Sequence, residues 1–277
     1  METKVVLITG ASAGIGLSAA VQLMEKGVRV YAASRRGGIP QKAQNGVGEL
    51  IPVQMDVNNP DVIASVVAQI LKENNRLDAV ICNAGNGIAG SIEDTSNEEM
   101  RYQFETNFFG LHEVTLQTMK IFRKQGFGKI IQHSSVLGLI SLKYRGAYNA
   151  SKYAIEGIND TLRQEVIGSN IFISTVNTGP VTSKFRENAL KKFNENIDIQ
   201  NSYFSEVYKK ELKTRLETKE DKAPFNLPAS SVGNIVLKIM ESKKPKPRYY
   251  VTSATHILGF LKRVLSTSLM DKLLNKI

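Results

Sequence analysis

Short apolar runs alternate with longer segments of helical periodicity along the first 180 residues. The apolar runs predict buried strands, and the segments in which apolar residues recur every three or four positions predict helices. Strands are predicted at residues 5–9, 28–33, 51–55, 77–82, 129–133 and 171–176; helices at 15–26, 62–71, 147–167 and after the capping box of Ser96 and Glu99. This order predicts an α/β fold with a doubly wound parallel sheet.

The regular alternation ends near Gly179, and residues 184–228 are predicted to be an insertion with helical structure. Its charged first part, residues 184–222, carries the aromatic residues Phe185, Phe193, Tyr203, Phe204 and Tyr208. Ligands of doubly wound sheets bind beyond the carboxyl ends of the strands, so an insertion there is placed to cover a substrate. The alternative is a solvated hairpin whose aromatic residues pack on the body. We predict one Rossmann-type domain over residues 1–277 with a substrate lid.

Composition fits one domain, because 42% of the 277 residues are hydrophobic and 22% are charged. The single cysteine, Cys82, excludes an internal disulfide, and three scattered histidines show no zinc spacing. We therefore expect no metal site and a reducing, cytoplasmic setting. The sequence enters a strand directly, without the pattern of a secretory signal, and no run approaches the roughly 20 apolar residues of a membrane span.

The net charge of +10 is concentrated in the tail, where residues 241–277 hold eight Lys or Arg against two acids. Within it, apolar residues at helical spacing predict a basic amphipathic helix over residues 254–277. Such a helix packs on its own domain, on a second subunit or on an anionic membrane surface; we favour protein packing and leave membrane contact open. Nucleic acid is not an expected partner, because there is no Trp for stacking and no recognised basic module.

A glycine-rich turn follows the first predicted strand and opens the first helix. It reads Thr-Gly-Ala-Ser-Ala-Gly-Ile-Gly and includes the candidate cofactor-binding residues Gly10, Ser12, Gly14, Ile15 and Gly16. In this setting the backbone amides at a helix N-terminus bind a pyrophosphate, and larger side chains would block the approach. The turn predicts a dinucleotide cofactor.

The second strand is followed by Ser34, Arg35 and Arg36, where an NAD-binding domain usually carries an acid for the ribose 2′-hydroxyl. A neutral residue and two guanidinium groups favour a 2′-phosphate instead, so we predict NADP(H). The next two strands also end in residues expected near the cofactor; these are Asp56, Val57, Asn83, Ala84 and Gly85.

Tyr148 and Lys152 are four residues apart in a helical segment and so share one face. A nearby ammonium favours the phenolate, and we expect it to lower the pKa of Tyr148 from about 10 toward working pH. The pair predicts a proton donor for carbonyl reduction and an acceptor for alcohol oxidation. Ser135 or its neighbour Ser134, just beyond the fifth predicted strand, is the candidate partner of the phenol.

Over about its first 185 residues the chain resembles the short-chain dehydrogenase/reductase family. The resemblance rests on the motifs Thr9-Gly10-xxx-Gly14-x-Gly16, Asn83-Ala84-Gly85, Asn107, Ser135 and Tyr148-xxx-Lys152. It implies a Rossmann fold, a dimer or tetramer, and a four-residue catalytic system. Tyr148 would be the acid/base, Ser135 would orient the substrate oxygen, Lys152 would bind the nicotinamide ribose, and Asn107 would hold a water of the proton relay.

The chain departs from the family after the sixth predicted strand, where the family's Pro-Gly appears as Thr178-Gly179. Gly179, Val181 and Ser183 remain candidate contacts of the nicotinamide, with Ser183 in the place of the usual threonine. The glycine spacing differs from the Gly-xx-Gly-xx-Gly of the related nucleotide-sugar epimerases.

The aromatic insertion favours a hydrophobic alcohol and its ketone or aldehyde as the substrate pair. The chain looks similar to hydroxysteroid and retinol dehydrogenase-like members and to aldehyde reductases. The alternative function is a catalytically silent NADP(H)-binding regulator or scaffold.

Overall fold

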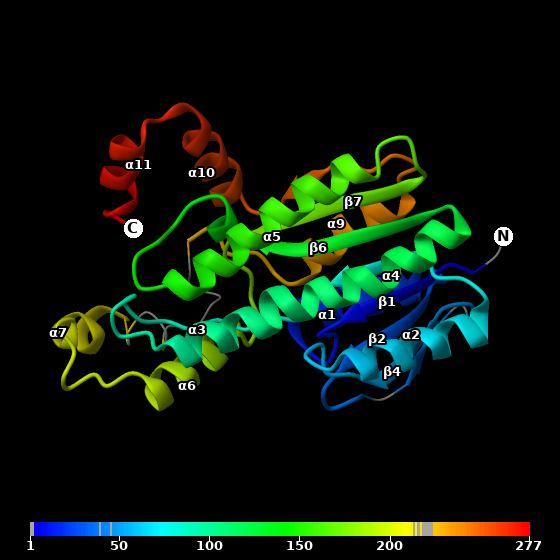
Figure 1. Ribbon diagram of the computed structural model, residues 1–277, viewed down its shortest axis with the longest axis horizontal. Helices are drawn as coiled ribbons and strands as arrows, with labels where there is room; N and C mark the ends of the chain where they lie inside the picture. Colours follow the sequence, from blue (N-terminus) through cyan, green and yellow to red (C-terminus); the bar gives the residue numbers. More distant parts are fainter. Residues whose placement is uncertain (1–2, 39, 45, 213, 215–216, 218–223) are drawn as a thin grey trace.

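A twisted sheet of eight strands forms the centre of the computed structural model, which describes residues 3–38, 40–44, 46–212, 214, 217 and 224–277 (Figure 1). The strand order is β3-β4-β2-β1-β5-β6-β7-β8, and β3 pairs antiparallel with β4 while the other pairs are parallel. The strands are β1 Val5–Thr9, β2 Arg29–Ser34, β3 Gln41–Lys42, β4 Glu49–Gln54, β5 Ala79–Cys82, β6 Gly128–Ser135, β7 Ile171–Thr178 and β8 Arg248–Tyr250. The predicted doubly wound α/β class is confirmed.

Helices cover both faces of the sheet and gather beyond the carboxyl ends of its strands. They are α1 Gly14–Glu25, α2 Pro60–Asn74, α3 Asn97–Phe104, the π-helix η1 Glu105–Gly110, α4 Leu111–Gln125, the 3₁₀ turn η2 Val136–Gly138, α5 Gly146–Glu165, α6 Phe185–Asn196, α7 Ser205–Val207, the π-helix η3 Tyr208–Leu212, α9 Ser230–Glu241, α10 Ser253–Val264 and α11 Thr267–Leu274. In Figure 1 the labelled helices α3, α6, α7, α10 and α11 lie at the end of the molecule opposite the N-terminus.

Two apolar cores form because successive residues of a buried strand point to opposite faces. On β1, Val5 and Leu7 pack with residues of α2, α4 and α5, whereas Val6 and Ile8 pack with residues of α1 and α9. Strands buried on both faces are continuous apolar runs, which is why the sequence pattern located them.

Four elements, namely β3, β8, α9 and the 3₁₀ turn η2, were not predicted, and one predicted helix differs from the structure. The strands β3 and β8 have two and three residues, too few for a visible alternation, and α9 was not among the predicted helices. The single predicted helix over residues 254–277 is two helices, because the chain leaves helical geometry at Leu265 and Ser266 caps α11 through a hydrogen bond from the Leu269 amide.

The insertion at residues 184–228 contains α6, α7 and η3, and its remaining predicted helical part includes residues 213, 215–216 and 218–223, which lie outside the described residues. Its core holds the buried side chains of Ala189, Phe193, Ile197, Tyr208 and Leu212. In the described part of the chain, no helix combines the length and apolar character that a membrane crossing needs.

Candidate active site

The glycine-rich turn joins β1 to α1 in a conformation that requires glycine. Gly10 and Gly14 have φ angles of 66° and 55°, a region that residues with a Cβ seldom adopt. A Cβ on Gly16 would lie 2.4 Å from the Gly10 carbonyl oxygen and 2.5 Å from Asn83 Nδ2. Gly16 is therefore required for packing against the end of β5, in addition to the ligand approach expected from the sequence.

The first turn of α1 is suited to an anion. The N-cap of α1, Ala13, has no capping side chain, and the first turn holds no acid. The partial positive charge of the backbone N–H groups at this helix N-terminus is therefore not neutralised by a side chain of the turn. Ser12 is exposed beside this turn, and Ile15 and Gly16 are its next residues. The turn thus fits the pyrophosphate of a dinucleotide, as the glycine pattern predicts.

Asn83 fixes the turn to the neighbouring strand end. Its Nδ2 donates to the carbonyls of Thr9 and Gly10 at 3.0 and 3.1 Å, while the Thr9 hydroxyl accepts from the amides of Asn83 and Ala84. Gly85 follows, and a Cβ there would lie 3.1 Å from Asn107 Oδ1. The predicted residues of this motif form a connected group around the turn.

His133, a residue that sequence reasoning did not select, continues this group toward β7. Its Nδ1 lies 2.9 Å from Asn83 Oδ1 and its Nε2 lies 3.1 Å from Thr178 Oγ1. Because Asn83 Oδ1 only accepts, Nδ1 carries the proton and Nε2 accepts from Thr178. Burial, followed by the charge of Lys152, lowers the pKa of His133 to about 3, so the ring is neutral.

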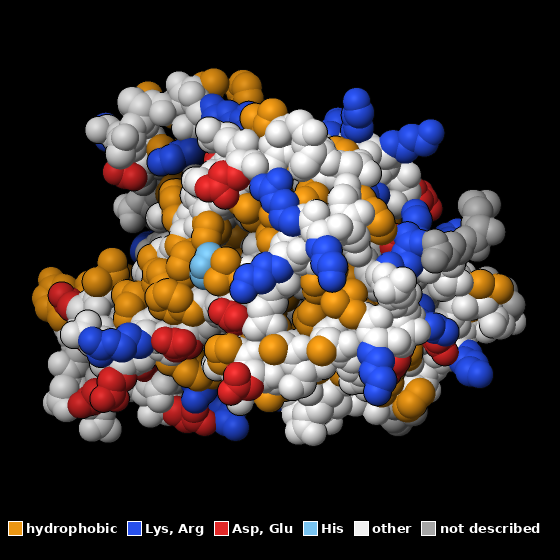
Figure 2. Space-filling view, turned by 45° about the vertical axis from the view of Figure 1, so that its right-hand side comes forward, with side chains coloured by type: hydrophobic (Ala, Val, Ile, Leu, Met, Phe, Trp, Pro, Cys, Tyr) orange, Lys and Arg blue, Asp and Glu red, His pale blue; other side chains and the backbone are white. Residues whose placement is uncertain are grey.

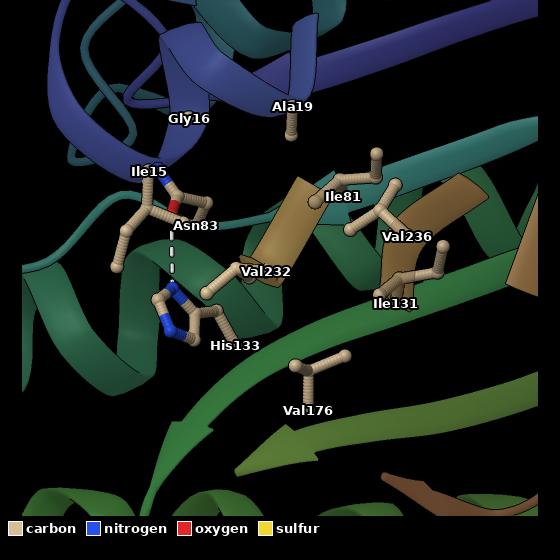
Figure 3. A pocket seen from close by; sticks show the side chains of 10 residues that line it. All are labelled: Ile15, Gly16, Ala19, Ile81, Asn83, Ile131, His133, Val176, Val232 and Val236. Carbon is tan, nitrogen blue, oxygen red and sulfur yellow. Dashed lines mark hydrogen bonds between the residues drawn. The ribbon is translucent and has the colours of Figure 1, made fainter. Parts of the chain in front are cut away.

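Figure 3 shows His133 beside a small apolar cavity between the sheet, α1 and α9, with the imidazole bonded to Asn83. The cavity is lined by Ile15, Gly16, Ala19, Ile81, Asn83, Ile131, His133, Val176, Val232 and Val236, and its volume is about 10 Å³. This space holds at most about one water molecule, so the cavity is a packing feature and not a substrate site.

The end of β2 carries the residues expected near the adenosine ribose. Arg35 and Arg36 are exposed, and Ser34 is buried with its hydroxyl donating to the Gly37 carbonyl at 2.9 Å. Ser34 therefore shapes the turn that presents the two arginines. Val57 is buried after β4, and the Asp56 carboxylate accepts from the Asn58 amide at 3.0 Å.

The candidate catalytic residues Ser135, Tyr148 and Lys152 lie at the carboxyl end of β6 and in the first turns of α5. Ser135, the last residue of β6, lies near enough to Tyr148 to lower the pKa of its hydroxyl, and the Ser135 hydroxyl also accepts from the Leu137 amide at 3.1 Å. The Ser134 hydroxyl has no partner in the described structure. Successive side chains of a strand point to opposite faces of the sheet, so only one of the two serines can face Tyr148, and it is Ser135. Lys152 Nζ lies 5.6 Å from the Tyr148 ring centroid and donates to the His133 carbonyl at 2.8 Å.

The pKa of Tyr148 departs from the expectation. Burial raises it to about 12, and the Ser135 hydrogen bond and the charge of Arg145 oppose this only in part. The predicted lowering by Lys152 is wrong here, because the ammonium points to a backbone carbonyl and burial lowers the pKa of Lys152 itself to about 8. At neutral pH the phenol holds its proton.

Asn107 lies in the π-helix η1 and is fully buried. Its Oδ1 accepts from the Asn86 amide at 2.9 Å, and its Nδ2 donates to the Asn86 carbonyl and to Ser151 Oγ. The side chain thus fastens the loop after β5 to α5, next to Lys152.

The segment after β7 brings further predicted residues to the glycine-rich turn. A Cβ on Gly14 would contact Ser183 Cβ at 3.4 Å, and Val181 is buried and bridges to Leu227. Gly179 permits close packing, since a Cβ there would lie 2.2 Å from Thr252 Oγ1. Ser183 lies beside the cofactor turn despite the altered motif.

The aromatic residues of the insertion have different positions. Phe185 packs against Tyr148 with 5.2 Å between ring centroids, whereas Phe193 and Tyr208 are buried in the core of the insertion and Tyr203 is 90% exposed. The tail also contributes, because Met270 and Leu274 of α11 pack in one cluster with Val136, Leu137 and Ile140, and Tyr148 packs against it; we call this the α11 cluster.

Comparison with known proteins agrees with this arrangement. A profile of the family described as short chain dehydrogenase matches residues 4–194. The uncharacterized oxidoreductase YbbO of Escherichia coli is 35% identical over 98% of this chain and 94% of its own length. A 3-ketodihydrosphingosine reductase of Bacteroides thetaiotaomicron is 33% identical over 93% of this chain and 91% of its own length.

Solved structures share the fold. A short chain dehydrogenase/reductase of Burkholderia phymatum in complex with NAD has a TM-score of 0.75 at 20% identity, covering 94% of this chain and 92% of that one. One of Burkholderia cenocepacia in complex with NADP has a TM-score of 0.72 at 20% identity, covering 98% of both chains. With the profile match, the relatives at 33–35% identity and the motif residues gathered around one cofactor turn, the chain belongs to the short-chain dehydrogenase/reductase family of oxidoreductases.

Proposed function

We propose that the chain is an NADP(H)-dependent oxidoreductase that interconverts a hydrophobic alcohol and its ketone or aldehyde, with Tyr148 as acid/base. The observation that carries the proposal is the meeting of Tyr148, Ser135 and Lys152 at the strand ends, between a dinucleotide turn and apolar walls. When bound, the nicotinamide supplies or accepts the hydride. The chain's own residues bind the substrate and move the proton.

Tyr148 donates its phenolic proton to the substrate oxygen in reduction and accepts a proton in oxidation. With its pKa raised to about 12 by burial, the phenol is in its acid form at neutral pH, which is the form that donates a proton to a carbonyl oxygen. Ser135, which lowers the pKa of the phenol, would orient the same oxygen. Lys152, whose Nζ lies 5.6 Å from the Tyr148 ring centroid and donates to the His133 carbonyl, would bind the nicotinamide ribose. Asn107 holds the loop after β5 in place and is the candidate for positioning a water in the relay.

A hydrophobic substrate is supported by the walls around Tyr148. Phe185 and the α11 cluster line this region with apolar side chains, and Ser135 and Arg145 are the polar residues that act on the Tyr148 hydroxyl. An apolar pocket with few convergent polar groups selects a substrate by its carbonyl and its apolar body. The insertion at residues 184–228 would act as the lid over the substrate bound at Tyr148.

Preference for NADP(H) is supported by the exposed Arg35 and Arg36 after β2, where no acid stands to meet the 2′-hydroxyl. The remaining candidates, Gly10, Ser12, Gly14, Ile15, Gly16, Val181 and Ser183, would contact the pyrophosphate and the nicotinamide. Assembly as a homodimer or homotetramer is supported by Phe109, Leu116 and Tyr153, which are exposed on η1, α4 and α5. Figure 2 shows hydrophobic side chains gathered over part of the face in view.

The test is oxidation of NADPH, and separately NADH, at fixed concentrations of steroid ketones, retinal, long-chain aldehydes and small polar ketones. We expect turnover of the hydrophobic compounds with NADPH. Replacing both arginines (Arg35→Ala with Arg36→Ala) should lower kcat/KM for NADPH about tenfold to a hundredfold, since a charged hydrogen bond contributes about 1.5–3 kcal/mol, and should leave NADH unchanged.

Lys72→Ala is the matched control, because this exposed lysine lies on α2 outside the proposed cofactor site. Equal efficiency with NADH in the unaltered protein would refute the cofactor assignment. Tight NADPH binding without turnover of any compound would favour the regulatory alternative.

A further inference from the structure

The two C-terminal helices have an inner face that reaches the candidate active site. Met270 and Leu274 of α11 are buried in the α11 cluster, and Leu258 and Leu261 of α10 pack against it. Tyr148 packs against the same cluster. The inner face of this segment is therefore one wall of the region in which the substrate carbonyl would meet Tyr148.

The outer face of the same segment is apolar and exposed. Ile257, Phe260 and Val264 recur at spacings of three and four on α10, so they share one side of that helix, and Phe260 is 64% exposed. Leu269 and Ile277, in and after α11, are also at least half exposed. Burying one face of these helices on the body leaves this second apolar surface uncovered.

Cations accompany the exposed apolar residues. Residues 253–277 include Lys262, Arg263, Lys272 and Lys276, all exposed, against the single acid Asp271. In Figure 1, α10 and α11 stand out from the sheet at the upper left, and Figure 2 shows hydrophobic and Lys or Arg side chains close together in the upper left of the molecule. An apolar strip with basic neighbours is the pattern of helices that lie in the interface of an anionic bilayer.

A second copy of the chain fits this surface less well. A symmetric dimer apposes the same patch on both copies. Here such a contact would bring the cations of one copy against those of the other, with only Asp271 to offset them. An anionic lipid surface offers charge complementarity over the whole patch and an apolar phase for Phe260 and its neighbours.

We propose that α10 and α11 dock the protein on an anionic lipid bilayer, through Ile257, Phe260, Val264 and the surrounding cations. The outer face of the segment would contact the lipid and its inner face belongs to the α11 cluster against which Tyr148 packs, so the segment would provide an apolar route for a membrane-dissolved alcohol or carbonyl compound to reach Tyr148. The docking stands on the two helices alone. The route rests on the function proposed above.

Co-sedimentation tests the docking with the full-length protein and two kinds of vesicle, phosphatidylcholine alone and phosphatidylcholine mixed with phosphatidylglycerol. We expect binding to the mixed vesicles, weakened by salt, and little binding to the neutral ones. Phe260→Glu, and separately the pair Lys262→Glu and Lys272→Glu, should each lower the partition coefficient about tenfold or more. Ile167→Glu is the matched control, since Ile167 is 81% exposed at the other side of the fold beyond α5 and should not change binding.

A second measurement separates docking from chemistry. NADPH oxidation is followed with a water-soluble short-chain aldehyde and with a long-chain aldehyde dissolved in the mixed vesicles. Phe260→Glu should reduce turnover of the vesicle substrate about tenfold while turnover of the soluble substrate and the melting temperature stay unchanged.

Absence of sedimentation with mixed vesicles, or equal binding of Phe260→Glu, would overturn the docking proposal while turnover of the soluble aldehyde still supports the oxidoreductase function. A light-scattering mass that falls from dimer to monomer on Phe260→Glu, without any vesicle binding, would assign the surface to a second copy. Vesicle binding without turnover of either aldehyde would retain the docking and refute the proposed chemistry.

Discussion

The neutral His133 gives the protein a specific dependence of stability on pH. Burial lowers the pKa of His133 to about 3, against about 6.5 for the unfolded chain. Between these values the unfolded state binds the proton and the folded state does not. Stability from this group is therefore complete above about pH 7 and is lost as the pH falls toward 3.

The magnitude follows from the pKa difference. One proton bound only by the unfolded state changes the free energy of unfolding by about 1.4 kcal/mol per pH unit. Between pH 8 and pH 5, protonation of His133 in the unfolded state should therefore lower the free energy of unfolding by about 2 kcal/mol. Isoleucine at this position is near in size and faces an apolar cavity, so His133→Ile should remove the proton uptake without opening a large void.

The same substitution has a cost at every pH. It removes the donor to Asn83 Oδ1 and the acceptor of the Thr178 hydroxyl, and each polar group left without a partner costs about 1–3 kcal/mol. The Thr178 hydroxyl can still donate to the Ser134 carbonyl at 3.4 Å, so the cost of removing its histidine acceptor should lie at the lower end of this range. The variant should be less stable than the unaltered protein at pH 8, and the difference should shrink by about 2 kcal/mol at pH 5.

Urea unfolding at pH 8, 7, 6 and 5 measures both quantities, provided that the slope against denaturant is unchanged between the proteins. His256→Ile is the control, because His256 is exposed on α10. If the difference in the free energy of unfolding between His133→Ile and the unaltered protein stays constant from pH 8 to pH 5, His133 is not held neutral. That result would also refute the assignment of its hydrogen bonds.

Three further expectations concern the reacting group, the insertion and the cofactor turn. Tyr148→Phe should lower kcat by about a hundredfold to ten-thousandfold with little change in the dissociation constant for NADPH, and an unchanged kcat in steady-state assays would speak for the regulatory alternative. Burial alone would raise the pKa of Asp94, but hydrogen bonds from Ser202, Tyr208 and Ser91 outweigh it and hold the pKa below its usual value, so the stability it contributes is present above about pH 4 and is lost as the pH falls through the folded value. Through Ser202 and Tyr208, Asp94 attaches the insertion to the loop after β5. Asp94→Asn should weaken this attachment by about 1–2 kcal/mol at neutral pH, which should appear as faster proteolysis within the insertion; equal cleavage rates in the two proteins would exclude this role of Asp94. Gly16→Ala should destabilise the protein by about 1–3 kcal/mol and weaken NADPH binding in calorimetry, whereas Gly157→Ala, where a Cβ meets nothing within 4 Å, should be neutral or stabilising; equal effects of the two would contradict the packing argument.

The sequence located the central strands because each is buried on both faces, and it selected the catalytic candidates because their spacing repeats a family motif. It did not reveal the His133 bridge, since that contact joins residues from three strand ends that are 45 to 50 positions apart. The available signal was a histidine near the end of a strand, two residues before Ser135 and so on the same side of β6.

The pKa of Tyr148 could not be predicted for a related reason. Helical spacing places Lys152 on the same face, but it does not give the direction of the ammonium, which donates to the His133 carbonyl. The break at Leu265 and Ser266 was also hidden, because apolar residues continue at helical spacing through it.

The π-helix at Glu105–Gly110 separates α3 from α4 without a loop, so these three elements form one continuous rod. Each residue of an α-helix advances about 100° around the axis, and a π-turn accommodates one residue more than an α-turn. Removing one residue from η1 would therefore rotate α3 relative to α4 by about that angle and carry Asn107 away from Asn86 and Ser151. In mutational terms, this short segment should tolerate many substitutions at its exposed positions and almost no change in length, the reverse of what is usual for a connection between two helices.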